Sequence, residues 1–463
     1  MVIILRLWNK EFFNSFFYVI IFLGDRMKKI FKYIVLFVLI LLFSLIINPL
    51  NLDEIWSYGF TNNIYNGLIP YKDFNMVITP FYPFIMSLIF YIFGNNMLVF
   101  YIENTFIVVL FIYICSKLLK DKTYLILPLL IFPISIVFPN YNFFLLFLFV
   151  LLIYLEKNNK NDYLIGIVLS FIFLTKQTVG ISLLLVSLYY LKDKKIFKRL
   201  IGFIIPNIIF IIYLFITNSF MKFIDLCFLG LFDFGKSNTN IFNMFFFMII
   251  ILLIILVKMI KKDSKRIEYY YLLMFISICI PLFDLYHFSI YLVSFIIIYL
   301  SNSRYIFNYK LIGLSLFIGL LLVYIFYSSF NYRVYPNDLN LFEYRYISSK
   351  NIKFSKKVLK YLDKYNNKVM FIGPDAYYYK LINNNKIGYL DLINSGNWGY
   401  NGSNKLIKKV KSLDKDYVFF VKKSELGIGR QTDQNIVKYI IKNGRKIDKL
   451  EMYDIYKLGD IDG

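Results

Sequence analysis

Long apolar stretches recur along the first 330 residues of the chain, and short clusters of lysine and arginine separate them. A helix needs about 20 apolar residues to cross the hydrocarbon core of a bilayer, a length that residues 30–50 reach. The whole chain is 59% hydrophobic, whereas soluble domains average about 45–50%. This pattern predicts a polytopic α-helical membrane protein.

The apolar stretches predict about eleven transmembrane helices, several of them short for a full crossing. They cover residues 30–50, 97–116, 124–139, 143–155, 163–175, 178–191, 200–217, 241–257, 269–283, 288–300 and 311–327. Residues 84–93 are apolar but only about ten in number, so they predict an interfacial or re-entrant helix instead of a span.

The distribution of charge predicts the orientation of these helices. Loops on one side hold 21 lysines and arginines, whereas loops on the other side hold only Lys72, Lys176, Lys222 and Lys236. Cytoplasmic loops carry the excess of positive charge, so we expect a multi-pass protein of the cell (cytoplasmic) membrane with its N-terminus inside. The chain has a net charge of +23, but in the first 330 residues the basic side chains sit in short clusters between apolar runs. That pattern is expected from orientation in a membrane and not from a nucleic-acid-binding face.

The composition divides the chain into three predicted parts. Residues 1–26 are a doubtful N-terminal extension, because Met27-Lys28-Lys29 before an apolar run has the pattern of a natural start. Residues 27–330 form the transmembrane domain, with residues 51–83 as its first outer loop. Residues 331–463 are mixed in character and predict an extracytoplasmic α/β domain. Its expected strands cover 369–373, 387–393, 417–421 and 452–456, and its expected helices 352–365, 404–412 and 433–443.

Two adjacent acids, Asp53 and Glu54, open the first outer loop where the first span should leave the membrane. Acids at this depth are costly to desolvate and seldom lack a partner or a function. They could form a general base for an acceptor hydroxyl, or they could cap an interfacial helix. Asp73 is a third acid on this loop, and its position after Pro70 is also typical of a turn.

Lys176 and Gln177 interrupt an apolar hairpin on the outer side. Lys176 could bind the phosphate of a lipid-linked substrate, or it could be a snorkelling lysine. His287 is the only histidine, and it follows Asp284 at a later outer hairpin. This pair could contact phosphate or stabilise the hairpin locally. No metal site is predicted from spacing, although a divalent cation could bind if Asp53, Glu54, Asp284 and His287 converge.

The expected outer domain holds a loop rich in glycine and asparagine, residues 394–402, with two aromatic side chains. Aromatic residues on a polar loop can stack on sugar rings. The alternative is an ordinary surface connection.

Several of these motifs together resemble one known family. The Asp53-Glu54 pair, the segment GLIPYKDF, the LTKQ hairpin and the late D-x-x-H hairpin are similar to the GT-C polytopic glycosyltransferases over residues 30–330. The likeness is to the bacterial, family 39-like branch of protein mannosyltransferases and the aminoarabinose transferase of lipid A. It implies a catalytic role for Asp53, polyprenyl-phosphate sugars as donors, and phosphate contacts from Lys176 and His287. The segment ITPFYP departs from the KPP or HPP that many members carry.

The sequence therefore predicts a membrane glycosyltransferase that moves a sugar from a polyprenyl-phosphate donor to an extracytoplasmic glycan, lipid or protein acceptor. We expect inversion at the anomeric carbon, with Asp53 and Glu54 as catalytic residues. Asp73, Lys176, Gln177, Asp284 and His287 are the expected substrate-binding residues. The alternative is a transporter or flippase of lipid-linked saccharides, which would place polar residues at mid-membrane depth along several spans.

Overall fold

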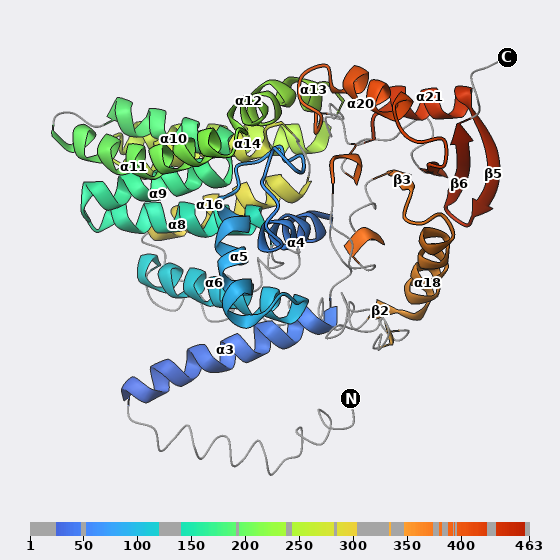
Figure 1. Cartoon of the computed structure of the whole chain (residues 1–463). Helices are drawn as coiled ribbons and strands as arrows, with labels where there is room; N and C mark the ends of the chain where they lie inside the picture. Colours follow the sequence, from blue (N-terminus) through green and yellow to red (C-terminus); the bar gives the residue numbers. More distant parts are fainter. Residues whose placement is uncertain are drawn as a thin grey trace, which may run out of the picture.

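The computed structural model describes a helical bundle and a C-terminal α/β region, which lie side by side (Figure 1). In the bundle it describes residues 25–47, 52–119, 140–190, 194–237, 243–281 and 285–302. In the C-terminal part it describes residues 333–334, 347–373, 379–381, 388–391, 393, 396–423 and 432–458. The expected boundary near residue 330, the expected spans 124–139 and 311–327, and residues 1–24 lie outside these ranges.

Most of the expected apolar helices begin and end close to the limits that hydropathy predicts. The helices of the bundle are α3 (Asp25–Ile47), α4 (Leu52–Tyr65), α5 (Phe81–Phe93), α6 (Met97–Leu118), α8 (Tyr141–Lys157), α9 (Asp162–Thr175), α10 (Gln177–Tyr190), α11 (Lys194–Ile216), α12 (Phe220–Ile224), α13 (Gly230–Ser237), α14 (Asn243–Lys262), α15 (Ile267–Phe275) and α16 (Leu285–Asn302). Of these, α4, α12 and α13 lie in stretches that were expected to be outer loops. A π-helical turn, Asp225–Leu229, links α12 to α13, and a 3-10 turn, Ile276–Cys279, extends α15.

Fewer of these helices than expected are long enough to cross a bilayer. Within the part of the chain that the structure describes, two helices have the length and apolar character of a span, Met97–Leu118 and Lys195–Ile216. Six more apolar helices are shorter, with α9 and α10 at 14 residues each. The apolar helices are those of a membrane protein, but they do not establish the number of spans.

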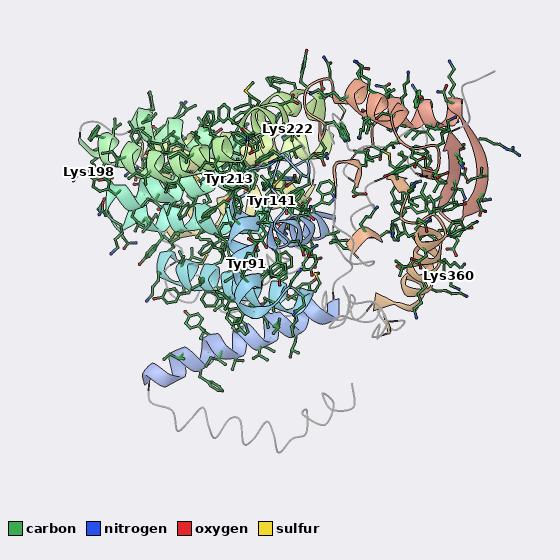
Figure 2. The ribbon with its side chains drawn as sticks, viewed as in Figure 1. Tyr91, Tyr141, Lys198, Tyr213, Lys222 and Lys360 are labelled. Carbon is green, nitrogen blue, oxygen red and sulfur yellow. The ribbon has the colours of Figure 1, made fainter. Side chains whose placement is uncertain are left out.

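Contacts at the two ends of the bundle show that α8 and α16 run in the same direction. Lys157 at the end of α8 donates to Ser301 Oγ (2.8 Å) and Asn302 Oδ1 (2.7 Å) at the end of α16. The start of α8 lies at the other end, where Asn142 contacts α4. Figure 2 labels Lys198 at the end of the bundle away from the C-terminal region and Tyr141 near the middle of the molecule.

Helices α9 and α11 pack closely against each other at the end of the bundle that contains Arg199. A Cβ on Gly166 would lie 3.0 Å from the Cα of Arg199, and a Cβ on Gly202 would lie 3.0 Å from the carbonyl carbon of Tyr163. Only glycine fits at such short separations, and small residues are the usual way for apolar helices to approach closely. Arg199 is thereby held against the start of α9.

The C-terminal region contains a small mixed sheet with helices on both faces (Figure 1). The strand order is β3 (Val369–Ile372), β4 (Val418–Lys422), β6 (Tyr453–Leu458) and β5 (Gly444–Leu450), with β3 and β4 parallel and the other pairs antiparallel. Alternate residues face opposite sides. Phe371 and Phe420 pack toward α18 (Ser349–Lys364), whereas Met370 and Phe419 pack toward α20 (Gly402–Lys411) and α21 (Gln434–Asn443).

The C-terminal region differs from the sequence-based expectations in two places. The expected strand at 387–393 contains instead a 3-10 turn, Tyr389–Asp391, in which the buried Asp391 carboxylate accepts a bond from the Gly388 N–H (2.8 Å). Burial raises the pKa of Asp391 above its ordinary value. The sequence analysis also missed β5, an edge strand with mostly exposed side chains, because its lysines and aspartate give no apolar alternation.

Candidate functional site

A cavity lies at the end of the bundle that faces the C-terminal region. It is bounded by α4, by the α9–α10 hairpin, by the start of α8 and of α16, and by one loop of the C-terminal region. Asp53, Lys176, Gln177 and His287 line it together. Four of the seven predicted site residues therefore converge, although they are up to 234 positions apart in the sequence.

Asp53 lies in the first turn of α4, the position at which a helix stabilises a negative charge. Its Oδ2 accepts a bond of 3.3 Å from the side-chain amide of Asn142 in α8. The side chain is half-buried, so the carboxylate is both positioned by the protein and open to the cavity.

Glu54 lies apart from Asp53, although the two are adjacent in sequence. Consecutive residues on a helix point in different directions, and Glu54 does not line the cavity. Its carboxylate is fully buried and accepts a bond from the hydroxyl of Tyr101 in α6. The structure thus separates the expected carboxylate pair into one acid at the cavity and one acid between helices.

Asp73 holds the turn that precedes α5. Its Oδ2 accepts a bond of 2.7 Å from the N–H of Ile69, and its own N–H donates to the carbonyl of Ile69 (2.9 Å). Asp73 is not among the residues that line the cavity. Asp73 therefore has the geometry of a residue that stabilises a turn, which is the alternative that the sequence left open.

Lys176 occupies the break between α9 and α10. Its side chain is 5% exposed, and its Nζ donates to the carbonyl oxygen of Ile278 (2.6 Å) in the 3-10 turn after α15. A snorkelling lysine would carry its ammonium to water, whereas this ammonium is buried at the cavity wall. An ammonium has three donors and a full positive charge, which suit it to contact with an anion.

Gln177 joins three segments around the cavity. Its Nε2 donates to the carbonyls of Val77 (3.1 Å) and Cys227 (2.5 Å), which connects the first outer loop with the π-helical turn. Its Oε1 has no hydrogen-bond partner among the described residues. Gln177 therefore positions the wall and also presents an acceptor.

His287 lies in the first turn of α16 and is 5% exposed. The preceding Tyr286 donates its hydroxyl to Asn140 Oδ1 (2.9 Å), which ties α16 to the start of α8. Asp284 lies outside the described residues. Among the residues that are described, no group of three or more His, Cys, Asp or Glu side chains could hold a metal ion.

The sequence analysis did not single out Asn142 or Thr178, which both belong to the site. Asn140 caps α8 by accepting a bond from the N–H of Phe143 (2.9 Å), and this cap directs Asn142 toward Asp53. An asparagine cap before an apolar run is a recognisable signal. No local sequence signal indicates that Asn142 contacts a residue of another helix.

These groups give the cavity a defined chemical capacity. A carboxylate, an ammonium and an imidazole line one cavity whose remaining wall includes the apolar side chains of Phe60, Ile78 and Ile280. The carboxylate can take a proton, and the two nitrogen groups can stabilise an anion.

A comparison with solved structures gives a match over almost the full chain. The crystal structure of ArnT from Cupriavidus metallidurans, bound to undecaprenyl phosphate, superposes with a TM-score of 0.51 at 8% identity, and covers 94% of this chain and 98% of ArnT. No family model and no curated protein sequence matches the chain. The chain thus has the fold of ArnT, a GT-C aminoarabinose transferase, and the resemblance inferred from its motifs is confirmed at the level of the fold.

Proposed function

We propose that this protein is a membrane glycosyltransferase that moves a sugar from a polyprenyl-phosphate donor to an extracytoplasmic glycan, lipid or protein acceptor. One observation carries the proposal: Asp53, Lys176 and His287 line the same cavity. A general base and two anion-stabilising groups are what transfer from a lipid phosphate requires. The complex of ArnT with undecaprenyl phosphate supports the donor class, because the two proteins share a fold.

The proposed reaction is a single displacement at the anomeric carbon. Asp53 accepts the proton of the acceptor hydroxyl as its oxygen bonds to the anomeric carbon. The bond from that carbon to the phosphate oxygen breaks, and the electron pair leaves with the lipid phosphate. Lys176 and His287 stabilise this developing negative charge, and the oxocarbenium-like transition state is that of other glycosyl transfers. The single step inverts the anomeric configuration.

The arrangement of charge supports an outward-facing site. Arg199, Lys198 and Lys157 lie at the end of the bundle opposite the cavity (Figure 2). Basic residues mark the cytoplasmic side of membrane proteins. We therefore assign residues 27–330 to a catalytic membrane domain and residues 331–463 to a domain on the extracytoplasmic side.

The direct test is sugar transfer by Asp53→Asn in membranes that contain a radiolabelled polyprenyl-phosphate sugar pool. Loss of a positioned general base lowers the rate by about 10²–10⁴-fold, whereas the nearly isosteric change leaves expression unaltered. Asp263→Asn is the matched control, because Asp263 is a partly exposed acid that pairs with Arg266 at the opposite end of the bundle.

Three results would count against the proposal. Unchanged transfer by Asp53→Asn removes the base from the mechanism. An equal loss in Asp263→Asn points to a general folding defect. Movement of intact lipid-linked sugar across the membrane without transfer by the parent protein favours the transporter alternative.

A further inference from the structure

One loop of the C-terminal region, Gly396–Gly402, docks on the helical bundle beside the cavity. We call it the docking loop. Its main chain forms three bonds to the bundle: Asn75 Nδ2 donates to the Asn397 carbonyl (2.6 Å), the Tyr400 N–H donates to Asp225 Oδ1 (3.0 Å), and the Asn401 N–H donates to Asp233 Oδ2 (2.7 Å). The side chain of Lys405, just after the loop, forms an ion pair of 2.6 Å with Asp225.

Glycines allow the two backbones to meet here. A Cβ on Gly230 in α13 would lie 2.6 Å from the Gly396 carbonyl oxygen and 3.0 Å from the Gly399 Cα. Gly399 has a φ of +73°, a conformation that other residues rarely adopt, and it lies against the Asp225 carboxylate. The sequence favoured an ordinary surface connection at this loop, whereas in the structure Gly396, Asn397 and Gly399 are buried against the bundle and Tyr400 remains exposed.

The side chain of Asn397 enters the cavity from this loop. It is fully buried, and it lines the same cavity as Asp53 and Lys176. Among the described residues, neither its Oδ1 nor its Nδ2 has a hydrogen-bond partner. A buried amide without hydrogen-bond partners is energetically unfavourable and rare in native proteins. We therefore expect a ligand to supply the partners of Asn397.

Two further uncharged groups at the cavity share this property. The Thr178 hydroxyl and Gln177 Oε1 are buried and have no partner in the part of the chain that the structure describes. Together the three residues offer both donors and acceptors. Sugar hydroxyls donate and accept in the same way, whereas a phosphate only accepts and already has Lys176 within the cavity.

We propose that Asn397, together with Gln177 and Thr178, binds hydroxyl groups of the donor sugar, so that the C-terminal region sets the sugar specificity of the membrane site. This inference rests on the proposed function. It divides the donor between two parts of the chain. In the bundle, Lys176 binds the phosphate and Asp53 acts as the base. Asn397 of the docking loop completes a sugar site that Gln177 and Thr178 of the bundle begin.

The test compares lipid binding by the purified full-length protein in nanodiscs. The probes are undecaprenyl phosphate without a sugar and a panel of undecaprenyl-phosphate pentoses and hexoses. The wild type prefers at least one sugar-bearing lipid over the sugar-free lipid. Asn397→Ala loses about tenfold of that preference, roughly the loss of one good hydrogen-bonding group, and binds the sugar-free lipid as tightly as wild type. Asn404→Ala, an exposed residue on the adjoining helix, keeps the wild-type preference.

A stability measurement separates recognition from a structural role. Asn397 makes no side-chain bond in the described protein, so Asn397→Ala leaves the melting temperature of the ligand-free protein unchanged or raises it. A lower melting temperature would indicate that Asn397 supports the fold. Asn397→Ser repeats the test with a small polar side chain, in case the alanine variant expresses poorly.

The outcomes distinguish the inference from the proposed function. Binding of no polyprenyl phosphate by the wild type refutes the proposed function, and with it this inference. Binding of the lipid phosphate without sugar preference in the wild type, or with the same preference in Asn397→Ala, refutes the inference alone. Equal weakening of the sugar-free and sugar-bearing lipids in Asn397→Ala places the residue at the phosphate and also overturns it.

Discussion

The bundle has a polar cluster at each end, and the two clusters are built differently. At one end, which we call the basic end, Arg199 donates to Glu156 Oε2 (2.8 Å) and to Asp162 Oδ1 (2.8 Å), and the Tyr271 hydroxyl donates to Glu156 (2.9 Å). At the cavity end, Asn397 and Thr178 have polar atoms without partners among the described residues. Both clusters are buried, so burial alone does not identify a functional site.

The two clusters differ in where their polar groups find hydrogen-bond partners. The basic end connects α8, α9, α11 and α15 through charges that the protein itself pairs. The cavity end gathers a carboxylate, an ammonium and neutral amides around a space. A saturated cluster stabilises the fold, whereas a cluster with unused donors and acceptors is prepared for a ligand. Each of the following predictions tests this division.

The largest expected effect is on stability at the basic end. Arg199→Met leaves Glu156 and Asp162 without their shared cation, and the loss of one partner of a buried ion pair costs about 3–5 kcal/mol. SDS titration of the purified protein in mixed micelles measures the change. Lys198→Met is the control, because Lys198 is exposed and its replacement costs less than about 0.5 kcal/mol. An Arg199→Met protein that kept its stability but lost its activity would contradict the structural role of the basic end.

The next effect is on chemistry at the cavity end. Lys176→Gln removes the ammonium that we assign to the phosphate, and loss of a charged hydrogen bond lowers kcat/KM by about 10–100-fold. Transfer assays over a range of donor concentrations measure the ratio. Lys222→Gln, at an exposed lysine of α12, stays within about twofold of the parent. Full activity in Lys176→Gln would return this residue to a purely structural role.

A smaller change in stability is expected at Glu54, and it tests whether this acid has a structural or a catalytic role. Tyr101→Phe removes a donor from the buried Glu54 carboxylate and costs about 1–3 kcal/mol of stability. The same SDS titration applies, with Tyr91→Phe as the control because Tyr91 is exposed. If Tyr101→Phe instead keeps its stability and loses transfer activity, Glu54 acts in catalysis as the sequence predicted.

The smallest effect concerns a surface contact outside both clusters. The Tyr361 hydroxyl bonds to Asp448 (2.7 Å) and holds the pKa of that carboxyl below its ordinary value of 3.8. The stability from this bond, about 0.5–1.5 kcal/mol, is therefore present above pH 3.8 and is lost as the pH falls through the lower folded-state pKa. Thermal unfolding of Tyr361→Phe should differ from wild type at pH 6 more than at pH 3. Tyr365→Phe provides the control, and a pH-independent difference would contradict the assignment.

The sequence predicted the helices well because hydropathy and charge are local signals. Residues 163–175 and 178–191 were expected as helices, and α9 and α10 occupy almost the same positions. Lys176 was found because a charge inside an apolar hairpin is rare. The separate surroundings of Asp53 and Glu54 could not be assigned without knowing that α4 starts at Leu52 and how it packs, because the helix points these adjacent side chains toward different neighbours.

The remaining features depend on contacts between distant segments. The main-chain carbonyl of Asn397 accepts a hydrogen bond from Asn75, which lies 322 positions earlier in the sequence. No local sequence pattern predicts this contact. The network of Arg199 with Glu156 and Asp162 also went unnoticed, because in the sequence these residues belong to ordinary charged loops. Such groups can be assigned only when the helices that carry them are placed in space.

The shortness of the α9–α10 hairpin has a consequence for the lipid around it. Each helix has 14 residues and so is about 21 Å long, compared with a hydrocarbon core of about 30 Å. If both helices cross the membrane, as the sequence predicts, a hairpin of that length favours a thinner bilayer beside Lys176, at a cost of fractions of a kcal/mol per ångström. Phosphate groups of the surrounding leaflet would then lie closer to the cavity. Acyl-chain length would thereby become a control on how readily the protein loads its donor, with short-chain membranes favouring access.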